Sequence, residues 1–208
     1  MCGSIRLMPI FTLGSTPPAN AFLAKNHLAR KEPQFPLDIY LCRTCSLVQL
    51  RDVVAPDLLF RNYVYVSSTS ASFIAHFQQL ATQAWKRFRC PHGALVVDIG
   101  SNDGIFLKPF KALGAAVVGV DPARAIALAA TKEGIPTIPE FFTPALARNM
   151  VKTRGRAAIV TATNVFAHVN DLDSFMRGVK YLLDDEGVFI IEAPYLIDFL
   201  DKNLLLLY

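Results

Sequence analysis

One stretch of the chain limits the possible folds more than any other. It is the apolar run 95–99, which is followed by the small and polar residues 100–104. Such a run is typical of a buried parallel strand, and glycines after it allow a tight turn whose backbone can approach a ligand. Asp121 follows about twenty residues later, where a carboxylate at the tip of the next strand can accept hydrogen bonds from two ribose hydroxyls. The pattern predicts a site for an adenosine-containing ligand.

The turn lacks the signatures of the common phosphate sites. Neither the Gly-x-Gly-x-x-Gly of dinucleotide sites nor the Gly-Lys-Ser/Thr ending of a P-loop is present. Instead, Asp98, Asn102 and Asp103 surround Gly100 and Gly104. Carboxylates there would repel a phosphate but suit an ammonium or sulfonium group, and S-adenosylmethionine carries both cations. The alternative interpretation is an ordinary strand-to-helix turn in which Asn102 or Asp103 caps the helix.

The composition is that of a folded protein with one large or two unequal domains. The 208 residues are 52% hydrophobic and 18% charged, which allows a sizeable core. Residues 1–90 hold 10 basic and 4 acidic side chains, whereas residues 91–208 hold 11 and 13. The basic charges are scattered, so we do not expect nucleic-acid binding. The sequence shows no apolar run of membrane-spanning length and no signal-peptide pattern, so we expect a cytoplasmic protein without a membrane segment.

The pattern of residues changes twice along the chain. Residues 1–55 are rich in Pro, Gly and Cys and predict a small ribbon-like module. Residues 56–92 show helical spacing of apolar side chains and predict a linking helical segment. Residues 93–208 alternate strands and helices, which predicts a parallel sheet with right-handed crossovers and a ligand site beyond the carboxyl ends of its strands. The predicted strands are 94–99, 116–121, 135–138, 157–162 and 187–192, and the helices 103–113, 123–133, 143–153 and 172–183.

Further motifs lie on both sides of the glycine turn. They are residues 13–14, 18–23, 35–37, 41–45, 47–50, 63–68, 98–104, 119–123, 141–142, 164–169 and 192–196. With these motifs, the chain resembles the S-adenosylmethionine-dependent sugar C-methyltransferases, which act on nucleotide-linked deoxysugars. The resemblance covers nearly the whole chain. It implies an α/β class I methyltransferase fold, with a Rossmann-like parallel sheet, preceded by a zinc-ribbon-like module.

The resemblance also implies zinc ligands. Cys42 and Cys45 form a complete Cys-x-x-Cys pair, whereas Cys2 matches the second cysteine of another pair whose first member would precede Met1. A closed structural zinc site takes four ligands, so three thiolates would need water, His27 or a partner's residue as the fourth. Buried thiols are the alternative interpretation of the Cys-x-x-Cys pair. The family continues past residue 208 into the segment that supplies its catalytic base, so we expect a chain truncated at both ends.

Spacing and resemblance assign the same roles around the cofactor. Gly100 would let the backbone meet the methionyl part, and Asp121 would bind the ribose. Asp98, Asn102 and Asp103 would face the ammonium group or line the pocket.

The remaining candidate residues come from other parts of the chain. Phe142, or its neighbour Phe141, would flank the adenine, although two consecutive aromatic residues usually mean that one is buried and one half-buried. Asn164 would contact the methionyl or sulfonium region, or would merely shape a turn. Tyr65 and Ser67 would cover the cofactor or meet the substrate, or would only begin a helix. His168 is the best candidate in the chain for the base that carbon methylation requires, with a structural or substrate-contacting role as the alternative.

The leading hypothesis is methyl transfer from S-adenosylmethionine to a ring carbon of a nucleotide-linked keto-deoxysugar, with zinc in a structural role. In that case the truncated chain would lack part of its catalytic machinery. The competing hypothesis is a non-catalytic remnant that binds S-adenosylmethionine or a partner through its cysteine module. A nicotinamide dehydrogenase is disfavoured by the missing glycine pattern. The sequence indicates neither the sugar, the methylated carbon nor the oligomeric state.

Overall fold

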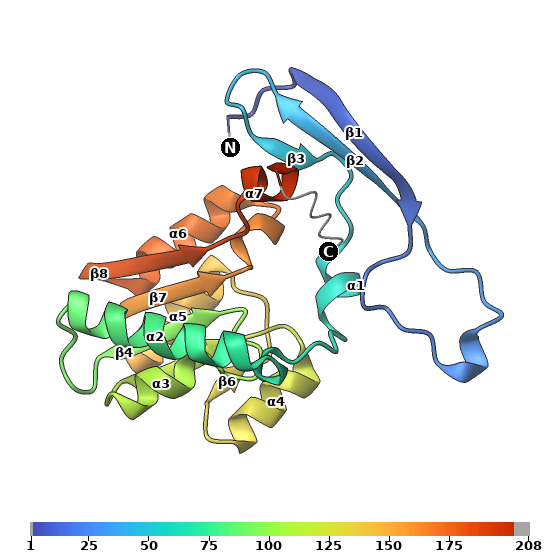
Figure 1. Ribbon diagram of the computed structural model, residues 1–208. Helices are drawn as coiled ribbons and strands as arrows, with labels where there is room; N and C mark the ends of the chain where they lie inside the picture. Colours follow the sequence, from blue (N-terminus) through green and yellow to red (C-terminus); the bar gives the residue numbers. More distant parts are fainter. Residues whose placement is uncertain (1, 202–208) are drawn as a thin grey trace. The chain divides into compact units, whose positions relative to one another are not determined.

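The computed structural model describes residues 2–201, which divide into two compact units (Figure 1). The first unit comprises residues 2–63 together with 197–201, and the second comprises residues 64–196. The second unit therefore begins before the helix that we predicted as part of a linking segment. No helix among residues 2–201 is long and apolar enough to cross a membrane.

The first unit is built on a three-stranded antiparallel sheet in the order β1-β2-β3. Its strands are β1 (Leu7–Thr16), β2 (Phe35–Cys42) and β3 (Val48–Leu50), and short helices follow at α1 (Pro56–Phe60) and α7 (Leu196–Asp201). The predicted ribbon-like module is confirmed. The tight turn after β2 brings Leu41 opposite Val48, which places Cys42 at the end of a strand and Cys45 in the turn.

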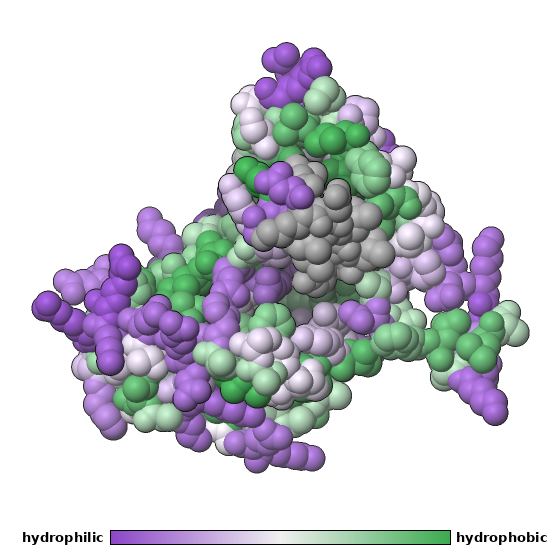
Figure 2. All heavy atoms as spheres, in the orientation of Figure 1, coloured by the Kyte–Doolittle hydropathy of each residue, from purple (hydrophilic) through white to green (hydrophobic). Residues whose placement is uncertain are grey.

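Exposed apolar side chains occur in this unit on the loop that joins β1 and β2. Phe22 is 81% exposed and Leu28 is 67% exposed. Figure 2 shows green residues on this loop.

The second unit contains a five-stranded parallel sheet in the order β6-β5-β4-β7-β8, as the alternation of elements predicted. Its strands are β4 (Leu95–Ile99), β5 (Ala116–Val120), β6 (Thr137–Ile138), β7 (Ala157–Thr163) and β8 (Leu183–Glu192). The helices are α2 (Ala71–Arg87), α3 (Leu107–Ala112), α4 (Arg124–Lys132), α5 (Pro144–Arg154) and α6 (Leu172–Leu182).

Two hydrophobic clusters cover the two faces of this sheet. Since side chains alternate along a strand, Val96 of β4 joins one cluster while Val97 joins the other. The Val96 cluster includes α2 and α3, and the Val97 cluster includes α5 and α6. Burial on both faces explains why β4 is a continuous apolar run rather than an alternating one.

The largest differences between the structure and the sequence prediction concern α2, α3 and β8. Helix α2 is part of the second unit because its buried Phe77, Ala81 and Ala84 pack in the same cluster as α3. Helix α3 begins at Leu107 rather than at 103, since the residues before it form turns. Strand β8 begins at Leu183 rather than at 187, with an irregular register between its first and second pairs with β7.

Candidate active site

The carboxyl ends of neighbouring strands bring three predicted site residues to one edge of the sheet. Gly100 follows β4, and its N–H donates to Val120 O at 2.7 Å. Asp121 follows β5 and donates from its backbone to Ile138 O at 3.0 Å, while the backbone of Asn164 after β7 donates to Glu192 O at 2.8 Å. In an open parallel sheet this edge is where ligands bind.

Gly100 has a backbone that only glycine adopts without strain. Its φ is +72°, and a Cβ added there would lie 2.2 Å from Cγ2 of Val165. The lack of a side chain therefore lets Val165 pack directly against the backbone of Gly100, and the predicted contact of Gly100 with the methionyl part of a cofactor stays a prediction.

Asp121 presents a buried carboxylate that its own turn holds in place. One oxygen accepts the N–H of Asn102 and the other accepts the N–H of Ala123, both at 2.8 Å. Burial raises the pKa of Asp121, and these two backbone hydrogen bonds oppose the rise. Each carboxylate oxygen has a further acceptor position, so the group can accept two ribose hydroxyls without losing its anchors.

Asp98 is buried more deeply, near the carboxyl end of β4. The hydroxyl of Thr161 donates to its Oδ1 at 2.6 Å, and the residue is 2% exposed. Burial raises the pKa of Asp98 to about 7, the Thr161 hydrogen bond opposes this, and repulsion from Asp121 adds to it. A cation bound nearby would favour the ionised form of this carboxyl group.

The side chain of Asn102 does not point freely into the turn. Its Oδ1 accepts the N–H of Ser67 at 3.0 Å, and its Nδ2 donates to Tyr65 O at 2.9 Å. The structure thus brings Asn102, Tyr65 and Ser67 together, but through the backbone of the latter two residues.

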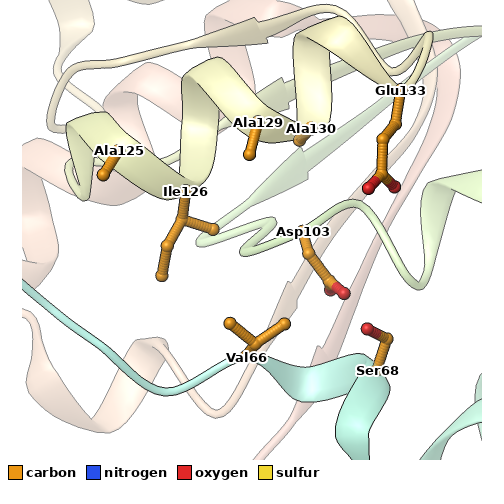
Figure 3. Close-up of a pocket in the computed structure, with 8 residues that line it drawn as sticks. All are labelled: Val66, Ser68, Asp103, Ala125, Ile126, Ala129, Ala130 and Glu133. Atoms are coloured by element: carbon orange, nitrogen blue, oxygen red, sulfur yellow. The ribbon is translucent and has the colours of Figure 1, made fainter.

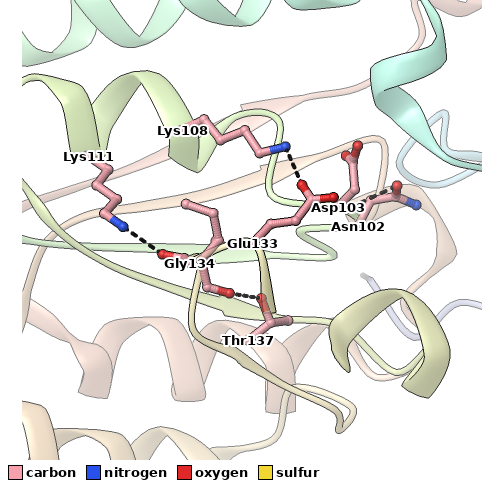
Figure 4. A network of polar contacts seen from close by, with 8 residues as sticks. Asn102, Asp103, Lys108, Lys111, Glu133, Gly134 and Thr137 are labelled. Atoms are coloured by element: carbon pink, nitrogen blue, oxygen red, sulfur yellow. Dashed lines mark hydrogen bonds and ion pairs between the residues drawn. The ribbon is translucent and has the colours of Figure 1, made fainter. Parts of the chain in front are cut away.

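Asp103 lines a cavity of about 280 Å³ beside α4 (Figure 3). The other lining residues are Val66, Ser68, Ala125, Ile126, Ala129, Ala130 and Glu133. The Oδ1 atom of Asp103 is buried and has no hydrogen-bond partner among the described residues. Glu133 is paired with Lys108 at 3.0 Å (Figure 4). This cavity is not lined by Gly100, Asp121 or Asn164. The predicted contact of Asp103 with a cofactor therefore rests on the sequence alone.

Phe142 packs into the interior on the α6 side of the sheet. Its ring lies 5.3 Å from that of Phe175 in an edge-to-face arrangement and also contacts Gly178. The predicted adenine contact of Phe142 stays a prediction. Asn164 is exposed with a φ of +55°, so both a turn role and a ligand contact fit its geometry.

His168 ends a 3₁₀ turn that follows β7 (Phe166–His168). Partial desolvation lowers the pKa of His168, which favours the neutral imidazole that a general base needs. Sequence reasoning did not pair His76 with Glu192, yet at the same edge of the sheet Nε2 of His76 lies 2.6 Å from Oε2 of Glu192, within hydrogen-bond distance. The only local signal for Glu192 is a charged residue at the end of an apolar strand, and the two partners are 116 residues apart.

The first unit holds a cluster of three cysteines. The sulfurs of Cys2, Cys42 and Cys45 all lie within 4.8 Å of one another, and the pair formed by Cys2 and Cys42 is 3.6 Å apart. Zn–S bonds of about 2.3 Å in a tetrahedron place the sulfurs about 3.8 Å apart, so this donor set fits zinc. Hydrogen bonds from the backbone of Thr44 and then of Cys45 lower the pKa of the Cys42 thiol to about 7. His27 is not part of the cluster.

We expect zinc to bind the full chain at one ion per molecule, with an affinity that rises between about pH 6 and 8 as Cys42 becomes thiolate. Replacing Cys42 with serine should weaken binding at least tenfold, as measured by competition with a chromogenic chelator. The matched control is Cys90→Ser, because Cys90 lies in the second unit and outside the cluster. Equal losses in both variants would argue against the cluster as the binding site.

Comparison with known proteins decides the family. A protein-family model described as "Methyltransferase domain" matches residues 73–207 of the sequence. The chain belongs to the methyltransferase family. A second model, described as "Putative zinc binding domain", matches residues 1–60 of this methyltransferase. The predicted combination of a zinc-binding module and a class I methyltransferase domain is thereby confirmed.

The methyltransferase has relatives of known name. It is 39% identical over 203 residues to the C-methyltransferase NovU of Streptomyces niveus, with 98% of this chain and 48% of the relative covered. It is 29% identical to a ubiquinone biosynthesis O-methyltransferase of Rhodopseudomonas palustris strain BisB5, with 51% and 42% covered. The chain thus spans less than half the length of these two relatives.

A solved structure supports the fold. The plantazolicin methyltransferase BpumL, in a complex with a pentazolic desmethylPZN analog and SAH, matches with a TM-score of 0.50 at 13% identity. The match covers 65% of this chain and 52% of BpumL.

Proposed function

We propose that this methyltransferase binds S-adenosylmethionine at the carboxyl ends of β4, β5 and β7. The observation that carries the proposal is the Asp121 carboxylate. Its two oxygens are fixed by backbone N–H groups, and it lies one strand away from Gly100, which has a left-handed backbone and no side chain. An acid in this place suits two ribose hydroxyls, and a turn without a side chain suits the methionyl group. The SAH in the BpumL complex supports the same assignment.

We further propose that the reaction is transfer of a methyl group to a ring carbon of a nucleotide-linked keto-deoxysugar. The support is the similarity to a C-methyltransferase over nearly the whole chain. The similarity to this C-methyltransferase extends through the module of residues 1–60, whereas the similarity to the O-methyltransferase covers 51% of the chain.

The residues at this edge can perform distinct parts of such a reaction. When bound, S-adenosylmethionine supplies an electrophilic methyl group. Asp121 would hold the ribose and Gly100 would let the backbone pack against the methionyl part, while Asp98 would offer negative charge once a nearby cation favours its ionised form. Carbon methylation also needs a proton to be removed from the carbon that attacks. Neutral His168 is our candidate within this chain for that step, and Asn164 precedes it in the loop after β7.

Calorimetric titration with S-adenosylmethionine and S-adenosylhomocysteine tests the cofactor assignment. Replacing Asp121 with alanine should weaken binding of both ligands at least tenfold, because both ribose contacts are lost. Asp173→Ala is the matched control, since Asp173 lies in the first turn of α6 and is remote in sequence from the glycine turn. Absence of binding by folded wild-type protein would contradict the proposal. Binding without methyl transfer to a nucleotide-linked keto-deoxysugar would instead favour a non-catalytic binding protein.

A further inference from the structure

Asn102 connects the proposed ribose site to a segment that precedes α2. Its backbone N–H donates to Oδ2 of Asp121 at 2.8 Å. Its side-chain amide bonds to the backbone of Tyr65 and Ser67, at 2.9 and 3.0 Å. One residue therefore contacts the acid that would hold the cofactor and also the segment 65–69, which includes the 3₁₀ turn Ser67–Thr69.

An amide side chain is suited to this connection. The segment offers one donor, the N–H of Ser67, and one acceptor, the carbonyl of Tyr65, and asparagine supplies the complementary pair. Oδ1 also accepts the N–H of Asp103 at 3.0 Å. The φ of Asn102 is +48°, a left-handed conformation that asparagine tolerates better than most residues.

Hydrogen bonds within the segment are local. The hydroxyl and the backbone N–H of Thr69 both donate to the carbonyl of Val66, at 2.8 and 3.3 Å. Tyr65 is 40% exposed, and Ser67 is partly exposed. Val66 and Ser68 line the cavity beside α4. The position of the segment therefore depends in part on the two hydrogen bonds from Asn102.

We propose that Asn102 is a positioning residue that couples occupancy of Asp121 to the position of residues 65–69. The inference rests on the proposed cofactor site. Ribose hydroxyls bound to Asp121 restrict its carboxylate, which in turn fixes the N–H of Asn102 and so the amide that holds the segment. The coupling is reciprocal. Bound cofactor stabilises the position of the segment by a certain factor, and releasing the segment from Asn102 lowers the cofactor affinity by the same factor.

Amide hydrogen exchange of the full chain, with and without saturating S-adenosylhomocysteine, tests this coupling. In the wild type, the ligand should slow exchange at residues 65–69 about tenfold, within the usual range of coupling between sites. In Asn102→Ala, this ligand-dependent protection should disappear, while protection of the Asp121 turn persists at ligand concentrations that restore saturation. The variant should bind the ligand about tenfold more weakly in calorimetry.

Two further variants separate coupling from a purely structural role. Asn102→Asp keeps the acceptor for Ser67 but loses the donor to Tyr65, so it should retain part of the protection and serves if the alanine variant does not fold. Asn149→Ala is the control, because Asn149 is exposed on α5. If Asn102 were only structural, its variants would unfold more easily yet keep the full ligand-dependent protection, and this result would overturn the inference while leaving the cofactor site intact. Wild-type protein that binds no ligand would overturn both.

Discussion

Replacing Asp98 with asparagine should raise the free energy of unfolding above pH 7 by up to about 4 kcal/mol, because one pKa unit corresponds to about 1.4 kcal/mol. Burial holds the pKa of Asp98 at about 7 in the folded protein, against 3.8 for an ordinary aspartate carboxyl group. Ionisation therefore favours the unfolded chain as the pH rises between these two values. Asparagine has no proton to lose and can still accept the hydroxyl of Thr161.

The gain should depend on pH in a defined direction. Below about pH 4, the carboxyl is protonated in both states and the gain should vanish; it should grow up to about pH 7 and then stay constant. Urea denaturation at about pH 4, 5.5 and 7.5 measures this, with Asp173→Asn as a control outside the site that should show no such trend. If the free energies of unfolding of the variant and the wild type differ by the same amount at all three pH values, the raised pKa of Asp98 is contradicted. The Asp98→Asn variant should also bind S-adenosylmethionine more weakly, since the negative charge is gone.

Alanine at Gly100 should destabilise the protein by about 2–4 kcal/mol and abolish measurable cofactor binding. The left-handed backbone accounts for about 1 kcal/mol, and forcing a methyl group against Val165 accounts for the rest. The expected contact of 2.2 Å between the new Cβ and Cγ2 of Val165 cannot persist, and the stiff β-branched side chain cannot easily turn away.

Gly93→Ala isolates the backbone part of this cost. Gly93 has a φ of +83°, and a Cβ there would meet no atom within 4 Å. Thermal and urea unfolding should therefore show a smaller loss for this variant than for Gly100→Ala. Adding Val165→Ala to Gly100→Ala should recover part of the lost stability, and no recovery would show that crowding is not the cause.

Elements with strong local signals could be predicted from the sequence. Strands β4, β5 and β7 were expected within a residue or two of their observed ends, because continuous apolar runs bounded by glycine or polar residues have few other interpretations. The beginning of α3 was predicted too early because residues 103–106 form turns before the helix. Helix α2 was seen as a helix, but its membership of the second unit depends on contacts of Phe77 with Phe106, which spacing alone does not encode.

In the candidate site, too, residues with a local sequence signal could be predicted and long-range contacts could not. Gly100 and Asp121 were predicted because each follows an apolar strand, and neighbouring parallel strands bring their ends together. The contacts of Asn102 with Tyr65 and Ser67 and of His76 with Glu192 join residues 35 to 116 positions apart. Such pairs depend on how helix and loop pack on the sheet, so no local pattern predicts them.

The two borders of the parallel sheet are unequal. Within residues 2–201, β6 at one border has two residues and β8 at the other has ten, and each pairs with a single neighbour. A two-residue strand presents almost no free backbone groups, whereas a long one presents a row of them. We therefore expect an additional strand, from the same polypeptide or from another molecule, to pair more readily with β8, where Ile191 is 44% exposed, than with β6.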